Sequence, residues 1–139
     1  AEEALAEREA RFRRLIENSS DYAMIVDLTG AITYVAPSVE RVLGYPPAEV
    51  LGLRPGDLLH PDDVPAVEAA IRGLIERPRD TTTVQYRIRH RDGRWCWLEN
   101  VANTLLPGDP SGGLVANCRD ITERVEAERR LRERDDVFR

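Results

Sequence analysis

The sequence contains only two cysteines and no run of eighteen apolar residues, and each shortage excludes a class of protein. Cys96 and Cys118 are too few and too far apart for a disulfide scaffold or a zinc site, so we expect free buried thiols in a reducing compartment. Nothing here is predicted to cross a bilayer, and the charged N-terminus is unlike a secretory signal. The expected location is the cytoplasm, with no membrane contact within this segment.

Lysine is absent, and positive charges are outnumbered by negative ones. The 20 basic residues, all arginine, are outnumbered by 25 acidic residues, which leaves a net charge of −5. A nucleic-acid-binding face needs clustered positive charge. One cluster, Arg87, Arg89, Arg91 and Arg94, lies on a strand pattern that alternates with apolar residues and is interpreted as the solvated edge of a hairpin. We therefore expect no nucleic-acid partner.

The 139 residues suffice for one domain, which the patterning divides into three parts. Residues 1–17 favour a helix, residues 18–121 form a mixed core, and residues 122–139 favour a second, highly charged helix. Each helix is expected to act as a linker, the second one leading to a next module.

Both predicted linker helices carry a narrow apolar stripe. Leu5 and Phe12 lie seven residues apart, as do Leu131 and Phe138. This spacing is typical of a coiled-coil seam, so these four residues are the candidate dimer seam. The two helices also match at a constant offset, which suggests that a second copy of the module begins where this sequence stops.

The core pattern predicts an α+β fold. We expect strands over 22–28, 31–35, 81–90, 95–105 and 114–121, and helices over 39–43, 47–51 and from the His60–Asp63 segment to about Arg77. Strands on both sides of a helical insert indicate an antiparallel sheet. Ser38, one of Asp62 and Asp63, and Thr122 are expected to cap helices.

Six short motifs, in order, resemble those of the PAS family. They are residues 12–21, 27–38, 42–45, 60–63, 91–94 with Trp97, and the closing Asp-Ile-Thr at 120–122. The resemblance implies a five-stranded antiparallel sheet with short helices across one face, flanked by N- and C-terminal linker helices. In the family that face encloses a small pocket, and the other face packs against a flanking helix or a second copy.

The periodic apolar faces supply candidates for such a pocket. They are Ile25, Val42, Leu43, Tyr45, Leu59, Val67, Ile71 and Tyr86. For each of them, simple close packing of the core is the alternative. Ala36 stands where the family often has Asn or Ser, which weakens the case for a polar ligand.

The cofactor stays unknown from the sequence. The helical insert has no cysteine for a covalent flavin adduct, and the long helix has no histidine for haem. Non-covalent flavin and an unusual haem ligand remain open, and no metal site is expected.

Catalytic residues are not expected. Ser38, His60 and Asp62 could be combined as a triad, but a helix-start role already explains His60 and Asp62, and no nucleophile elbow or phosphate loop is present. The chain is interpreted as a regulatory domain, so any kinase or cyclase activity would belong to another part of its parent protein.

The resemblance implies a signal relay at the closing motif, carried by Asp120, Ile121, Thr122 and Arg124. Thr122 is expected to cap the last helix, Asp120 to pair with Arg124, and Ile121 to anchor the junction in the core.

The predicted function is a sensory module of a bacterial signalling protein, of the sensor histidine kinase or diguanylate cyclase type. It would relay ligand or conformational signals through dimeric linker helices. The alternatives are a ligand-free interaction or dimerisation module and a flavin or haem sensor. The expected partners are a second copy, bound through the flanking helices and the outer sheet face, and an adjacent PAS or output domain in the same chain.

Overall fold

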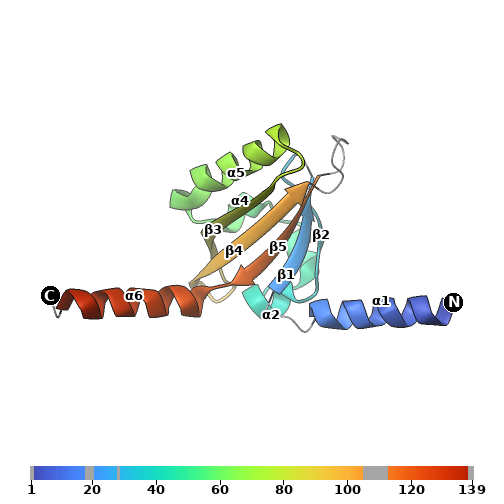
Figure 1. Ribbon diagram of the computed structural model, residues 1–139, viewed down its shortest axis with the longest axis horizontal. Helices are drawn as coiled ribbons and strands as arrows, with labels where there is room; N and C mark the ends of the chain where they lie inside the picture. Colours follow the sequence, from blue (N-terminus) through green and yellow to red (C-terminus); the bar gives the residue numbers. More distant parts are fainter. Residues whose placement is uncertain (1, 18–20, 28, 105–112, 138–139) are drawn as a thin grey trace.

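The computed structural model describes residues 2–17, 21–27, 29–104 and 113–137 (Figure 1). Its elements, in chain order, are α1 (Glu2–Glu17), β1 (Asp21–Val26), β2 (Ile32–Val35), α2 (Val39–Leu43), α3 (Pro47–Leu51), α4 (Pro55–Leu58), the 3₁₀ turn η1 (Pro61–Asp63), α5 (Val64–Glu76), β3 (Thr81–Arg89), β4 (Trp95–Thr104), β5 (Leu114–Asp120) and α6 (Thr122–Val137). The predicted α+β fold class is confirmed. The predicted strand ends at Leu28 and Leu105 lie outside the described residues.

The five strands form one antiparallel sheet in the order β2-β1-β5-β4-β3. The first and last strands are therefore neighbours, while the helical insert between β2 and β3 crosses one face of the sheet (Figure 1). This arrangement makes β5 the central strand of the sheet, and α6 continues from the end of that strand.

Alternation along β1 and β4 sets the core. In β1 and β4 every second side chain is buried on the face toward the insert, beginning with Tyr22 and Cys96. Leu98 in β4 and Leu74 in α5 are almost completely inaccessible, at 0% and 1% exposure. Burying each such side chain stabilises the fold by roughly 1.5–3 kcal/mol.

The helix starts differ from the predicted caps. The Ser38 hydroxyl does not cap α2; it donates to the carbonyl oxygen of Asp21 at 2.9 Å and ties α2 to β1. Asp63, which precedes α5, makes no capping bond because its carboxylate binds Arg87. The acceptor at the start of η1 is the His60 ring, which takes the Asp62 N–H. The short helix α4 was not predicted.

The two terminal helices leave the same end of the sheet and extend in opposite directions (Figure 1). Leu5 on α1 is 60% exposed and Leu131 on α6 is 61% exposed, so neither is covered within this chain. Phe138 and the side chain of Phe12 lie outside the described residues. Among the described helices, none has both the length and the apolar character needed to cross a membrane.

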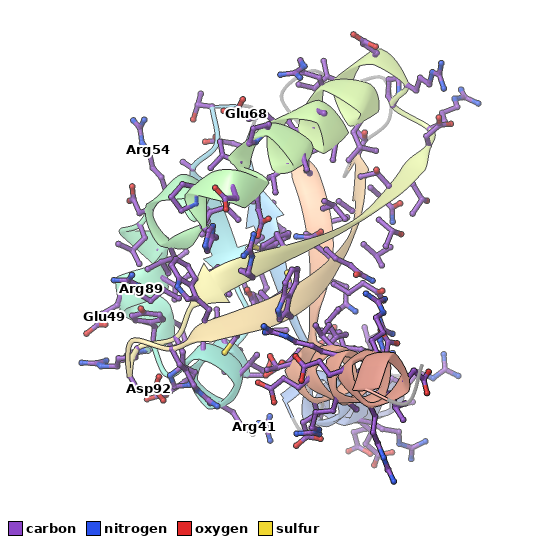
Figure 2. All side chains as sticks on the ribbon, turned by 90° about the vertical axis from the view of Figure 1, so that its left-hand side faces the viewer. Arg41, Glu49, Arg54, Glu68, Arg89 and Asp92 are labelled. Carbon is purple, nitrogen blue, oxygen red and sulfur yellow. The ribbon has the colours of Figure 1, made fainter. Side chains whose placement is uncertain are left out.

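Figure 2 looks at the molecule with α6 end-on. Arg41, Glu49, Arg54, Glu68 and Asp92 lie at the outside of the molecule, and all five are exposed. Charged side chains therefore lie on the outer surface of the helical insert and at the β3–β4 turn.

Candidate functional site

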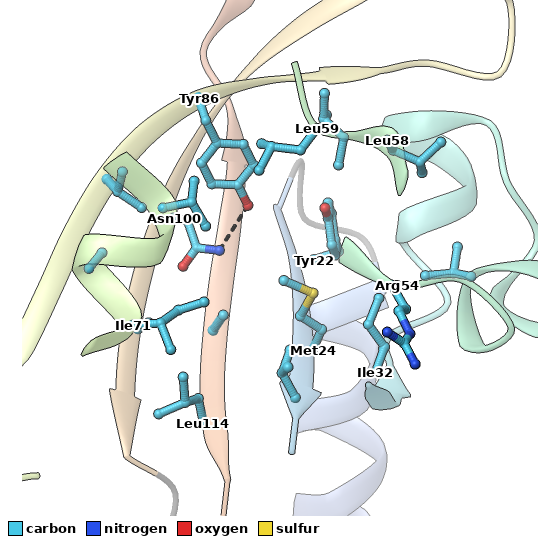
Figure 3. Close-up of a pocket in the computed structure, with 18 of the residues that line it drawn as sticks. Tyr22, Met24, Ile32, Arg54, Leu58, Leu59, Ile71, Tyr86, Asn100 and Leu114 are labelled. Atoms are coloured by element: carbon cyan, nitrogen blue, oxygen red, sulfur yellow. Dashed lines mark hydrogen bonds between the residues drawn. The ribbon is translucent and has the colours of Figure 1, made fainter. Parts of the chain in front are cut away.

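A cavity of about 100 Å³ lies between the helical insert and the inner face of the sheet (Figure 3). Its lining is predominantly aliphatic and aromatic, with a few polar side chains. The described lining residues are Tyr22, Met24, Val26, Ile32, Leu43, Val50, Leu53, Arg54, Leu58, Leu59, Val67, Ala70, Ile71, Leu74, Thr82, Val84, Tyr86, Ile88, Asn100, Ala102, Leu114 and Ala116.

The structure brings together part of the predicted pocket set. Leu43, Leu59, Val67, Ile71 and Tyr86 line the cavity, whereas three candidates do not. Those three are Ile25, Val42 and Tyr45.

The three misplaced candidates have physical explanations. Ile25 lies on the opposite face of β1, because Tyr22, Met24 and Val26 take the inward positions of that strand. Tyr45 turns to the β3 edge, where its hydroxyl donates to the carbonyl oxygen of Arg89 at 3.2 Å. Val42 is 7% exposed but packs in the core away from the cavity.

Asn100 is the functional candidate that sequence reasoning missed. It occupies an inward position of β4 between Leu98 and Ala102, where apolar residues are the rule, and it is only 8% exposed. The signal that could have identified it is a polar residue at one of the alternate strand positions that otherwise hold buried apolar residues.

Asn100 belongs to a buried polar cluster. Its Nδ2 donates to the Tyr86 hydroxyl at 2.9 Å and approaches the Cys118 sulfur at 3.4 Å. The Tyr86 hydroxyl and the Cys118 sulfur are 3.9 Å apart. Burial raises the pKa of Tyr86 well above its ordinary value and raises that of the Cys118 thiol to about 11, so both groups are protonated at neutral pH.

The carbonyl oxygen of Asn100 is the exception within this cluster. Buried polar atoms are usually paired, yet Oδ1 of Asn100 has no hydrogen-bond partner among the described residues. Figure 3 shows this oxygen turned away from the Tyr86 hydroxyl, on the side where Ile71 lies.

The closing motif forms a hydrogen-bonded junction between the sheet and α6. The Asp120 carboxylate accepts the N–H of Thr122 at 2.9 Å and its hydroxyl at 2.6 Å. The Thr122 hydroxyl accepts the N–H of Trp97 at 3.0 Å, and the N–H of Ile121 donates to the Trp97 carbonyl at 2.9 Å. Two neighbouring residues of the chain exit are thus bonded to one residue of β4.

These contacts correct two expectations. Asp120, not Thr122, supplies the acceptor at the start of α6, because the Thr122 hydroxyl is directed to β4. Arg124 does not pair with Asp120; its guanidinium lies 3.6 Å from the carboxylate of Glu99 on β4. Ile121 is 4% exposed, so it does anchor the junction in the core.

The outer face of the sheet carries an aromatic strip. The Arg87 guanidinium lies 5.0 Å from the Trp97 ring centroid, and that of Arg89 lies 4.9 Å from the Trp95 ring. The ring centroids of His60 and Trp95 are 4.7 Å apart, with the two ring planes tilted by 53°. Two of the four arginines interpreted as a solvated edge, Arg87 and Arg89, therefore stack on tryptophans, whereas Arg91 and Arg94 pair with the carboxylates of Glu49 and Asp92.

The described residues offer little for metal or acid–base chemistry. They contain no group of three or more His, Cys, Asp or Glu side chains arranged to hold a metal ion. Cys96 and Cys118 are free and buried, as expected. Ser38 and His60 each take part in a structural hydrogen bond: the Ser38 hydroxyl donates to the Asp21 carbonyl on β1, and the His60 ring accepts the nearby Asp62 N–H.

Comparison with known proteins gives consistent matches. A family model described as "PAS fold" matches residues 32–116. The White collar 2 protein of Neurospora crassa is 37% identical over 93 residues, which cover 67% of this chain and 17% of that protein. The blue light receptor lreA of Aspergillus flavus is 32% identical over 88 residues, or 63% of this chain and 10% of the receptor. The chain thus spans less than a fifth of these relatives.

Solved structures agree with the sequence matches. The structure of a sensory box histidine kinase/response regulator from Burkholderia thailandensis E264 superposes with a TM-score of 0.73 at 26% identity. The superposition covers 92% of this chain and 97% of that one, so it includes more than the sheet and its insert.

Proposed function

This chain belongs to the PAS family of sensory domains, and we propose that it is a regulatory input module that converts a change in its cavity into a change in α6. In this proposal residues 18–121 are the sensing core, while residues 1–17 and 122–139 are linkers to neighbouring parts of a longer protein. The module itself is not catalytic.

One observation carries the proposal: β4 serves both the cavity and the exit. Asn100 and Ala102 of β4 line the cavity. Trp97, three residues before Asn100, holds the start of α6: its N–H donates to the Thr122 hydroxyl and its C=O accepts the Ile121 N–H. A shift of β4 against the insert therefore displaces the N–H and C=O groups to which α6 is bonded. If a ligand in the cavity stabilises one position of β4 over another, the start of α6 shifts with that strand, and this shift is the signal.

The wider setting is part of the proposal. The named relatives include a sensory box histidine kinase and a blue light receptor, which supports a parent protein of the sensor-kinase type, with a diguanylate cyclase as the other candidate. Light sensing through a covalent flavin adduct is not proposed, because the insert from 39 to 77 contains no cysteine. Two free buried thiols support a reducing, cytoplasmic setting.

The test is to change the cavity and observe the junction. Ala102→Leu places a larger side chain in the cavity from β4 and so fills part of it; the variant should therefore alter hydrogen exchange of the Val125 amide, whose N–H donates to the Ile121 carbonyl. Asn103→Leu, the next residue and exposed on the other side of β4, is the control. Unchanged Val125 exchange in a folded Ala102→Leu protein would rule out the relay.

A second candidate function rests on the outer sheet face. Tyr34 is 48% exposed, and its cross-strand partner Ile25 is only partly buried, as are Val115 and Val101 on the next two strands of the same face. Together with the exposed Leu5 and Leu131, this surface supports the alternative of a dimerisation module. Under this alternative, Ile25→Arg would convert a dimer to a monomer in analytical ultracentrifugation, while a wild-type monomer at high concentration would exclude it.

A further inference from the structure

We infer that the cavity takes a small, uncharged ring carrying one N–H or O–H donor, and that this donor bonds to Oδ1 of Asn100. The inference deepens the proposed function, and rests on it in treating cavity occupancy as the input. It specifies the chemical class of the molecule that supplies the signal.

The first step is the fixed orientation of Asn100. Its Nδ2 is engaged by the Tyr86 hydroxyl at 2.9 Å and the Cys118 sulfur at 3.4 Å. This engagement leaves the acceptor oxygen pointing away from Tyr86 (Figure 3). The cluster therefore presents an acceptor, not a donor, to the cavity.

The second step is the cost of leaving that acceptor unpaired. Asn100 is 8% exposed and its Oδ1 has no partner within the described part of the chain. An unsatisfied buried polar group is destabilising, so a molecule that donates a hydrogen bond here gains more than its apolar contacts alone provide.

The lining and volume of the cavity limit the charge and size of the ligand. Among the described lining residues only Arg54 is charged, and it is exposed rather than within the apolar interior. A charged group beside Met24, Leu74 or Ala102 would lose its hydration without compensation. A closed cavity of roughly 150 Å³ holds benzene, so the present volume of about 100 Å³ suits a single small ring.

The test compares two rings of the same shape. Pyrrole has one N–H donor, and furan has an oxygen in its place and no donor. Binding to the intact 139-residue chain is followed by NMR titration of the Asn100 side-chain amide and the β4 backbone amides. We expect pyrrole to bind about five- to tenfold more tightly than furan, the ratio corresponding to one net hydrogen bond.

Variants assign the preference to Asn100. Asn100→Leu should remove the pyrrole preference and bring the ratio close to one, whereas Asn103→Leu, on the outer side of the same strand, should leave it unchanged. If Asn100→Leu does not fold, the wild-type ratio still decides the matter. Equal affinity for the two rings, tighter binding of furan, or no binding of either ring at the highest concentration of the titration would overturn the inference.

The two proposals fail separately. A pyrrole preference without any change in Val125 exchange would keep the ligand class and reject the relay. A change in Val125 exchange on Ala102→Leu substitution, with no pyrrole preference, would keep the relay and reject the ligand class.

Discussion

Asp63, the residue just before α5, holds the edge strand β3 through Arg87. Its carboxylate accepts the Arg87 backbone N–H at 2.7 Å, Nε at 3.0 Å and Nη2 at 2.9 Å. The next backbone link runs in the opposite sense, because the His60 N–H donates to the Arg87 carbonyl at 3.0 Å. Both backbone groups of Arg87 are thus occupied at what would otherwise be an open sheet edge.

Removing this carboxylate should destabilise the fold. Asp63→Ala leaves a backbone N–H and a guanidinium without their acceptor, and the Asp63 side chain is only 14% exposed. We expect a loss of about 2 kcal/mol in the free energy of unfolding, measured by urea denaturation. Asp62→Ala is the matched control, because the Asp62 side chain is 76% exposed and should contribute less than about 0.5 kcal/mol.

The same ion pair predicts acid sensitivity. The side-chain hydrogen bonds of Arg87 hold the pKa of Asp63 below its ordinary value of 3.8, against the opposing effect of burial. A lowered folded-state pKa gives stability that is present above about pH 4 and lost as pH falls through the folded pKa. Urea midpoints between pH 5 and pH 2 should fall less steeply for Asp63→Asn than for the wild type; parallel curves would contradict this.

At the α6 junction, the Thr122 hydroxyl can be deleted without changing shape. Thr122→Val removes the acceptor of the Trp97 N–H and the donor to Asp120. We expect a loss of about 1 kcal/mol and faster exchange of the Val125 amide hydrogen. Thr122→Ser keeps the hydroxyl and should retain wild-type exchange; a Ser variant as fast as the Val variant would show that the methyl group matters instead.

Gly113 occupies a position that only glycine fits. Its φ is +73°, and a Cβ added there would lie 2.5 Å from the carbonyl oxygen of Val26. Gly113→Ala should therefore cost about 3 kcal/mol, from left-handed strain and overlap together. Gly30→Ala, with φ of +91° but open space, should cost about 1 kcal/mol. Thermal denaturation of both variants separates strain from overlap, and equal losses would exclude the overlap.

The buried thiol predicts alkaline sensitivity. Burial raises the pKa of Cys118 to about 11 from an ordinary value of 9.0. Because the folded-state pKa is raised, the stability is fully present below pH 9 and is lost as pH rises through 11. Cys118→Ala should flatten the fall in urea midpoint between pH 9 and pH 11. An unchanged slope would assign that fall to other groups, such as the buried Tyr22 and Tyr86.

The sequence predicted strand positions well because alternation and turn residues are local signals. The Asp92-Gly93 turn and the alternation from Val84 to Ile88 located β3 and β4 to within a residue or two. The helix caps were predicted poorly, because Ser38 and Asp63 have acceptors or donors brought to them by strands far away in sequence. A local preference is overridden wherever a distant partner is available.

The cavity lining was predicted only in part for a related reason. Alternate residues of a strand face opposite sides of the sheet, and the sequence does not show which side the insert covers. Ile25 was therefore selected in place of Met24. Asn100 was overlooked because its role depends on Tyr86 and Cys118 from two other strands. Such clusters exist only once the sheet is assembled.

The length of α6 sets the rotational orientation of whatever is joined to its far end. An α-helix rotates by about 100° and rises about 1.5 Å with each residue. One residue inserted into α6 would therefore move a segment joined to that helix by only about 1.5 Å, yet would rotate it about the helix axis by about 100°. Seven inserted residues would return the segment to within roughly 20° of its original orientation. The number of residues in α6 would therefore fix the rotational orientation, relative to the sheet, of any segment joined to it as a continuous helix.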